Sequence, residues 1–97
     1  MSLKQLMDED QRLVILRACI DAGGDANESI LQAVLDTYGH RISRDLVRNH
    51  ILWLEEQGTV TVERPGGYFV VSITGRGQDV AEGRATIQGI KRPRARG

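Results

Sequence analysis

The chain has 97 residues, of which 40% are hydrophobic, and its 13 Lys/Arg and 13 Asp/Glu give a formal net charge of zero. A chain of this length forms one domain and buries about 60–65% of its unfolded surface. The composition fits a globular protein better than a disordered or membrane one, and no apolar run reaches the ~18–20 residues of a membrane-spanning helix. The N-terminus lacks the features of a secretory signal, which predicts a cytoplasmic protein. The single Cys19 excludes an intramolecular disulfide and a multi-cysteine zinc site.

The first predicted element is a helix from about residue 8 to residue 22. Asp8 and Gln11 have the spacing of a capping box, and Gly23-Gly24 ends the helix. Residues 13–20 are apolar around more of the circumference than the single stripe of a surface helix. We therefore expect part of this helix to contact another chain; the alternative is that it lies at the centre of the protein's own core.

Two shorter amphipathic helices follow, joined by the turn at residues 39–42. Asn27 can cap the first, and Ser43 can cap the second, which spans residues 43–57 and ends before Gly58. Apolar residues in the first recur three and four positions apart: Ile30, Leu31, Val34, Leu35 and Tyr38. The inward stripe of the second is Val47, His50, Ile51 and Leu54, and its opposite face carries Arg44, Asp45, Arg48 and Asn49.

The apolar period changes to two from Thr59 onward. Residues 59–63 and 68–73 alternate in this way on either side of Pro65-Gly66-Gly67, which predicts a β-hairpin with these three residues at its tip. Thr74 can then cap a short helix that ends at about residue 83.

Beyond Arg84 the composition is that of an arm rather than of a helix or strand. We expect a folded domain over residues 1–84 and a basic C-terminal arm over residues 85–97. The order of elements is that of a winged helix-turn-helix. It is an α+β fold with three N-terminal helices, a two-stranded hairpin as the wing, a short C-terminal helix and a basic tail.

Charge is distributed unevenly along the chain. Residues 1–40 contain 3 basic and 7 acidic residues, a balance of −4, whereas residues 41–97 contain 10 and 6, a balance of +4. The last 14 residues contain no acid and five basic residues: Arg84, Lys91, Arg92, Arg94 and Arg96. Such an asymmetry favours a surface that faces nucleic acid.

Several segments resemble known families. Residues 43–60, in which Leu54-Glu55-Glu56-Gln57-Gly58 leads into a strand, resemble the recognition helix and first wing strand of winged-helix regulators of the MarR and ArsR type. Thr74 and Gly77 are similar to the entry to their last helix. Residues 10–17, 53–58, 79–84 and 89–93 resemble more closely a family of small, uncharacterised proteins of Mu-like prophages. That resemblance implies a phage or prophage origin and a winged-helix fold.

The predicted DNA contacts combine major-groove chemistry with phosphate contacts. In the major groove, Arg pairs with guanine and Asn with adenine. The predicted residues are Ser43, Arg44, Arg48 and Asn49 on the helix, Arg64 in the wing, and Lys91 and Arg92 in the arm. The alternative for the helix is a solvated face in which Asp45 and Arg48 form an ion pair. Arg64 would pair with Glu63, and the arm would otherwise be a solubilising end or clasp a partner through Ile87 and Ile90.

Other chemistry finds little support in the sequence. His40 lies in the predicted turn and His50 on the inner stripe, without a third ligand at metal spacing. We expect Cys19 to be a buried, inert thiol. The pattern offers no nucleophile with an adjacent base, so we expect no enzyme, cofactor, metal or small-molecule effector.

Two functions fit these patterns. The first is a sequence-selective double-stranded DNA-binding protein, a transcriptional regulator that dimerises through the first helix and the C-terminal segment. Its two recognition helices would lie about 34 Å apart. The alternative is a protein-interaction or assembly module in phage DNA packaging, which the neutral net charge and the weakly basic wing favour. Charge reversal at Arg48 is expected to abolish specific DNA binding, without unfolding, only in the first case.

Overall fold

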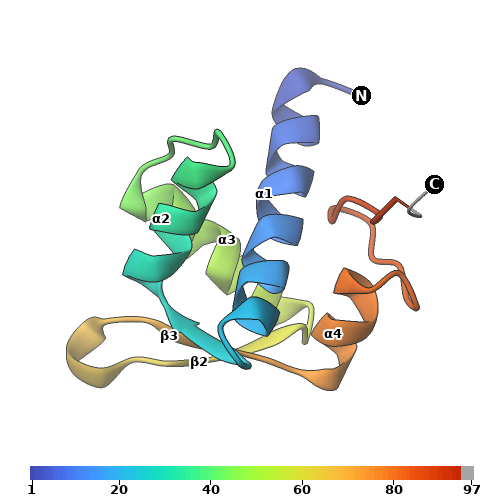
Figure 1. Cartoon of the computed structure of the whole chain (residues 1–97). Helices are drawn as coiled ribbons and strands as arrows, with labels where there is room; N and C mark the ends of the chain where they lie inside the picture. Colours follow the sequence, from blue (N-terminus) through green and yellow to red (C-terminus); the bar gives the residue numbers. More distant parts are fainter. Residues whose placement is uncertain (95–97) are drawn as a thin grey trace.

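The computed structural model describes residues 1–94, which form four α-helices and a three-stranded sheet (Figure 1). In chain order the elements are α1 (Leu3–Asp21), β1 (Asp25–Asn27), α2 (Glu28–Thr37), α3 (Arg44–Glu56), β2 (Val60–Glu63), the 3₁₀ turn η1 (Pro65–Gly67), β3 (Val70–Ile73) and α4 (Gly75–Ala81). The helices pack on one another above the sheet, and the β2–β3 hairpin extends away from them as the wing (Figure 1). None of the described helices is long and apolar enough to cross a membrane.

Helix α1 begins five residues earlier than Asp8, the predicted cap. Ser2 caps it instead: its hydroxyl accepts the Gln5 N–H at 3.1 Å, and the Gln5 side chain accepts the Ser2 N–H at 2.9 Å. This reciprocal pair is a true capping box. Asp8 lies inside the helix, where its carboxylate pairs with Lys4 at 2.8 Å.

The middle of α1 is the centre of the protein's own core. It contacts α2, α3, α4 and β3, and its buried apolar residues are Leu13, Ile15, Leu16, Ala18 and Cys19. The expectation that this apolar surface contacts another chain is therefore wrong for these five buried residues. Exposed apolar side chains lie instead in the first turns, where Leu3 is 71%, Leu6 53% and Met7 40% exposed.

The sheet has one more strand than predicted. Strand β1 pairs antiparallel with β3, with Asp25 opposite Ser72 and Asn27 opposite Val70, so the order is β1-β3-β2. The prediction missed β1 because Asp and Asn are depleted in strands and its three residues are too few to show a period. Backbone pairing with β3 alone makes this segment a strand.

The other predicted caps are confirmed. Asn27 accepts the Ile30 N–H at 2.8 Å, and Ser43 and Thr74 cap α3 and α4 in the same way. Helix α4 lies so close to the start of β2 that a Cβ at Gly77 would stand 2.1 Å from the Thr59 carbonyl oxygen. Only glycine permits this approach, which sets the position of α4.

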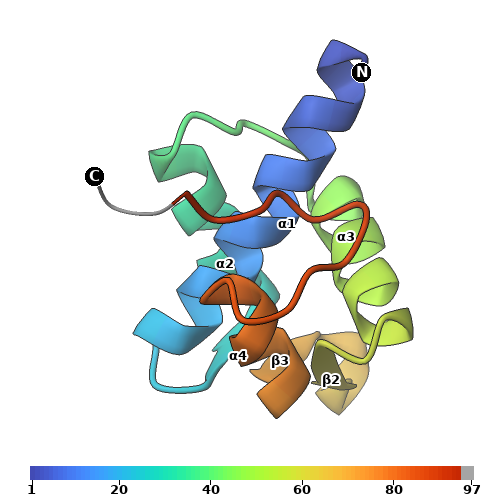
Figure 2. The same cartoon turned by 90° about the vertical axis from the view of Figure 1, so that its right-hand side faces the viewer.

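The segment after α4, predicted as a basic arm, packs against the rest of the domain. We call residues 85–94 the C-terminal strap, which crosses α1 (Figure 2). Ile87 and Ile90 are buried, and the Lys91 N–H donates to the Glu9 carbonyl at 3.1 Å. The two isoleucines that we considered for a partner contact are therefore buried in the protein's own core. Residues 95–97, including the predicted basic Arg96, lie outside the described part.

Candidate nucleic-acid interface

Helix α3 has three distinct faces. Its inward stripe is buried as predicted, and its outermost face carries Asp45, Asn49, Leu52 and Glu56. Arg44 and Arg48 lie between these faces, with 38% of each side chain exposed. The two arginines are therefore neither core residues nor freely solvated.

Glu28, at the start of α2, holds both arginines. Its side chain is fully buried, and its carboxylate accepts from Arg44 Nη1 at 3.1 Å and from Arg48 Nε and Nη2 at 2.8 and 2.9 Å. The Phe69 N–H donates to the same carboxylate at 2.6 Å. Sequence reasoning missed Glu28, because an acid in the first turn of a helix is ordinarily explained by the helix dipole.

Further contacts fix the direction of each guanidinium. Arg44 Nε donates to the Gln32 side chain at 2.9 Å, and Arg48 Nη2 donates to the Gly67 carbonyl at the wing tip at 3.1 Å. The Arg48 guanidinium also stacks on the Phe69 ring, 4.6 Å from its centroid. Arg48 thus pairs with Glu28 and not with Asp45, the partner in the alternative of a solvated face, and it links α3 to the wing.

The charge state of this cluster follows from its hydrogen bonds. The hydrogen bonds that Arg48 donates to Glu28 outweigh the cost of burying the carboxylate. Together with the bonds from the Phe69 N–H and Arg44, they lower the pKa of Glu28 to about 2. The hydrogen bonding between Arg48 and Glu28 also raises the pKa of Arg48. Two cations and one anion leave a net charge of +1. Within residues 1–94, neither Arg44 Nη2 nor Arg48 Nη1 has a hydrogen-bond partner, so both remain available to a ligand.

The wing carries one of the predicted basic residues. Arg64 Nη2 pairs with Glu55 of α3 at 3.0 Å, so the expected pairing with Glu63 is wrong. Its guanidinium lies 5.1 Å from the centroid of the Phe69 ring, on which Arg48 also stacks. The tip turns at Gly66, whose φ of +58° suits glycine.

The remaining predicted contacts fall into two groups. Ser43 and Asn49 are exposed on the same helix as the arginines, although the Ser43 hydroxyl also accepts the Leu46 N–H. Lys91 belongs to the strap, and its ammonium pairs with Asp10 of α1 at 3.2 Å. The wing and the strap lie on opposite sides of α1 (Figure 1). The structure therefore separates Lys91 and Arg92 from the arginine cluster.

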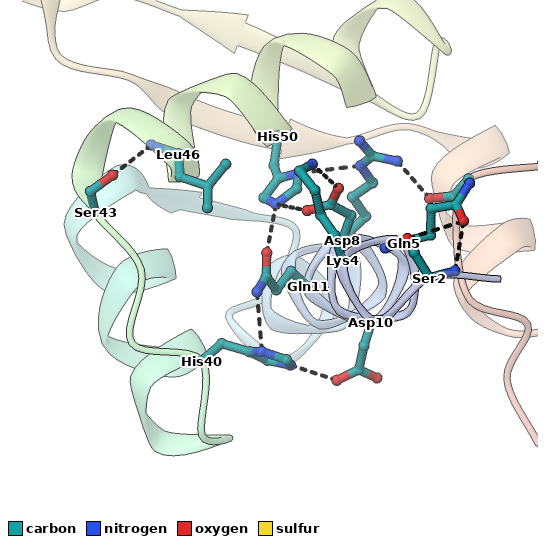
Figure 3. A network of polar contacts seen from close by, with 12 residues as sticks. Ser2, Lys4, Gln5, Asp8, Asp10, Gln11, His40, Ser43, Leu46 and His50 are labelled. Atoms are coloured by element: carbon teal, nitrogen blue, oxygen red, sulfur yellow. Dashed lines mark hydrogen bonds and ion pairs between the residues drawn. The ribbon is translucent and has the colours of Figure 1, made fainter.

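A second polar cluster holds the opposite side of α3 (Figure 3). The His50 ring contacts Gln11 at 2.7 Å, Gln11 contacts His40 at 3.2 Å, and His40 contacts Asp10 at 2.6 Å. Arg12 Nε donates to His50 Nδ1 at 3.2 Å. This donation assigns the proton of the neutral His50 ring to Nε2, so the hydrogen bonds run in one direction from Arg12 to Asp10.

The buried part of this second cluster is uncharged. Burial lowers the pKa of His50 to about 4, and the nearby Arg12 cation adds to the effect. His50 is consequently neutral at pH 7, and its approach to Asp8 at 3.8 Å is not an ion pair there. Burial opposes ionisation of Asp10, but hydrogen bonds with His40 and Lys91 outweigh it and lower the pKa of this carboxyl.

Other reactive groups are sparse in the described residues. Cys19 is fully buried, and burial, together with the nearby Asp25, raises the pKa of its thiol to about 12. Residues 1–94 contain no group of three His, Cys, Asp or Glu side chains that could hold a metal ion.

Comparisons with known proteins identify phage relatives. The chain is 58% identical to the uncharacterised protein gp26 of Escherichia phage Mu over 94 residues, covering 97% of this chain and 98% of gp26. It is 62% identical to an uncharacterised protein of Haemophilus influenzae over 77 residues, covering 78% and 76% of the two chains. No protein-family model matches the sequence.

A solved structure supports the winged-helix fold. The chain is similar to BpsR of Bordetella bronchiseptica, whose DNA binding is regulated by 6-hydroxynicotinic acid, with a TM-score of 0.60 and 21% identity. The match covers 74% of this chain and 49% of that one, so it spans about half of the BpsR chain. At this identity the similarity concerns the fold alone.

Proposed function

The chain belongs to the family of gp26 of phage Mu, and we propose that it is a DNA-binding regulator of phage or prophage origin. In this proposal α3 enters the major groove of double-stranded DNA in the host cytoplasm. The observation that carries it is the arginine cluster: Arg44 and Arg48 are held on α3, beside the wing, with donor groups left over.

The chemistry of α3 suits base recognition. A guanidinium can pair with the O6 and N7 atoms of guanine, and the exposed Asn49 amide can pair with adenine in the same groove. Both arginines lie in the N-terminal half of the helix, the part of a recognition helix that contacts base edges. Selectivity is therefore proposed to come from Arg44, Arg48 and Asn49.

Phosphate contacts would come from other groups. Ser43 at the start of α3 and Arg64 in the wing flank the arginine cluster and could bind the backbone on either side of the groove. Lys91 and Arg92 lie apart from this surface, so we propose for them a contact with a more distant phosphate or with a second duplex segment.

We also propose a homodimer formed by the first turns of α1. Leu3, Leu6 and Met7 are exposed at helical spacing, whereas Ile87 and Ile90 of the C-terminal segment are buried against the same chain. The proposed interface is thus narrower than the one expected from the sequence. Light scattering of the wild type and of a Leu3→Glu/Leu6→Glu variant tests it: a wild-type monomer at high micromolar concentration would contradict the dimer.

The structure changes the choice of variant for testing DNA binding. Charge reversal at Arg48 would place a second carboxylate beside the buried Glu28, so we now expect that change to unfold the protein. Arg44→Gln is milder, because Glu28 keeps its two bonds to Arg48. Arg41→Gln is a matched control, since Arg41 precedes α3 and 88% of its side chain is exposed.

The experiment begins with duplexes selected by the wild-type protein from a random pool. Fluorescence anisotropy then compares the selected duplex with a scrambled one. Arg44→Gln is expected to lower the ratio of the two affinities by about tenfold or more, the worth of one bidentate base contact, and Arg41→Gln to leave it unchanged. A wild type that shows no preference for any selected duplex would contradict sequence-selective binding.

A protein-interaction module is the second candidate. The exposed Asp45, on the outermost face of α3 in the same N-terminal half as the arginines, would repel phosphate, and this observation favours a protein partner. In that case the wild type would bind DNA duplexes only weakly, and these complexes would dissociate at 200 mM salt. Binding of the protein partner would depend on Leu3 and Leu6.

A further inference from the structure

We infer that Glu28 is the positioning residue that sets the DNA selectivity of this protein, by holding both recognition arginines and the wing in one arrangement. This inference rests on the proposed DNA-binding function. Glu28 would not touch DNA itself, because its side chain is fully buried beneath the arginines.

The first argument concerns the freedom of the arginine side chains. A free arginine samples many rotamers and must be ordered when it binds a base. Here one carboxylate receives three guanidinium hydrogen bonds, and Gln32 receives a fourth. Arg44 and Arg48 are thus ordered before any ligand arrives, so a duplex with its guanines in the matching positions binds at lower entropic cost.

The second argument concerns the wing. The Glu28 carboxylate accepts the Phe69 N–H, and the Glu28 N–H donates to the Phe69 carbonyl at 2.9 Å. Arg48, bound to the same carboxylate, also reaches the Gly67 carbonyl. One acid therefore fixes the angle between the recognition helix and the wing, which decides whether both can contact one duplex together.

The third argument concerns charge. Two unpaired arginines would attract any phosphate, and such contacts are independent of base sequence. A buried anion beside them cancels one of the two charges and draws their donors inward. Glu28 is therefore expected to weaken binding to arbitrary DNA while it favours the matching sequence.

The test compares Glu28→Gln with Glu56→Gln. The second change removes the same charge from an exposed position on α3 where, within residues 1–94, no ion pair forms. Affinities for the selected and scrambled duplexes are measured by fluorescence anisotropy between 50 and 200 mM KCl. Glu28→Gln is expected to lower the selectivity ratio about tenfold and to steepen the salt dependence by about one phosphate contact. Glu56→Gln should change neither selectivity nor slope by a comparable amount.

A third variant, Glu28→Asp, guards against misfolding. It keeps the charge but shortens the side chain, so its salt slope should stay near that of the wild type while its selectivity falls. Urea unfolding establishes that each variant is folded before binding is compared. If a folded Glu28 variant selects DNA as well as Glu56→Gln does, the role of Glu28 is refuted and the DNA-binding function stands. If the wild type itself does not select DNA, both proposals fail.

Discussion

The two polar clusters that hold α3 solve the same packing problem with different chemistry. On the wing side, a charged carboxylate binds two half-exposed arginines. On the α1 side, the neutral His50 ring connects through the Gln11 amide to His40 and Asp10, and the charged side chains of Arg12 and Asp8 lie beside that ring. The buried carboxylate of the wing-side cluster thus has partners that water reaches, whereas the buried side chains of the α1-side cluster, His50 and Gln11, are neutral. The difference suggests that the wing side serves binding and the α1 side serves stability.

The largest expected effect comes from removing the anion of the wing-side cluster. Glu28→Ala should lower the free energy of unfolding by about 3 kcal/mol, because two guanidiniums and the Phe69 N–H lose their acceptor. Glu56→Ala should change it by less than about 0.5 kcal/mol. Urea denaturation of the two variants measures the contrast. Equal stabilities would mean that the cluster contributes nothing to folding.

Breaking the α1-side cluster is expected to lower the free energy of unfolding by a smaller amount. Gln11 is almost fully buried and joins the two histidines, so Gln11→Met would leave both rings without one partner. We expect a loss of about 2 kcal/mol in the free energy of unfolding, with DNA selectivity unchanged. A variant that keeps its stability but loses selectivity would reverse the roles assigned to the two clusters.

The two clusters should also respond to acid in different pH windows. The pKa of His50 is lowered from 6.5 to about 4, so the unfolded chain binds a proton first and stability falls between these values, by at most about 1.4 kcal/mol per pH unit. The pKa of Glu28 is lowered from 4.5 to about 2, so protonation of this carboxyl lowers the free energy of unfolding only below pH 4.5. Chemical denaturation from pH 7 to pH 3 follows both. In His50→Gln the loss between pH 6.5 and 4.5 should shrink, and an unaltered profile would show that His50 does not titrate there.

The smallest effect on stability is expected at the outermost face of α3. Asn49 is exposed, so Asn49→Ala should change the free energy of unfolding by less than about 0.5 kcal/mol. If Asn49 reads adenine, the same variant loses preference at one base position of the selected duplex. Thermal melting together with a second selection from the random pool separates these outcomes.

The sequence predicted the features that depend on neighbours along the chain. Ser43 caps α3 through the Leu46 N–H only three residues away, and the buried stripe of α3 follows its helical period. It did not predict the role of Glu28, whose partner Phe69 is 41 residues away, because no local rule relates the two positions. Strand β1 was missed for the same reason, since only β3 makes it a strand.

The candidate site shows the same division. The sequence predicts Arg44 and Arg48 as site residues from their residue types and spacing, but it does not predict that Glu28 binds both of them. Lys91 and Arg92 are predicted from their charge alone. They lie apart from Arg44 and Arg48, because Ile87 and Ile90 of the same strap pack into the core and Lys91 pairs with Asp10. Whether any of these residues contacts DNA stays a prediction.

The burial of Cys19 has a practical consequence for all of these experiments. A thiol with no exposed surface and a pKa of about 12 does not react with maleimide reagents while the protein is folded. A cysteine introduced at an exposed wing position such as Thr61 could therefore carry a fluorophore or spin label without replacement of the native residue. Labelling of Cys19 itself would then report unfolding, so one protein would provide both a probe of the wing and an internal measure of its own integrity.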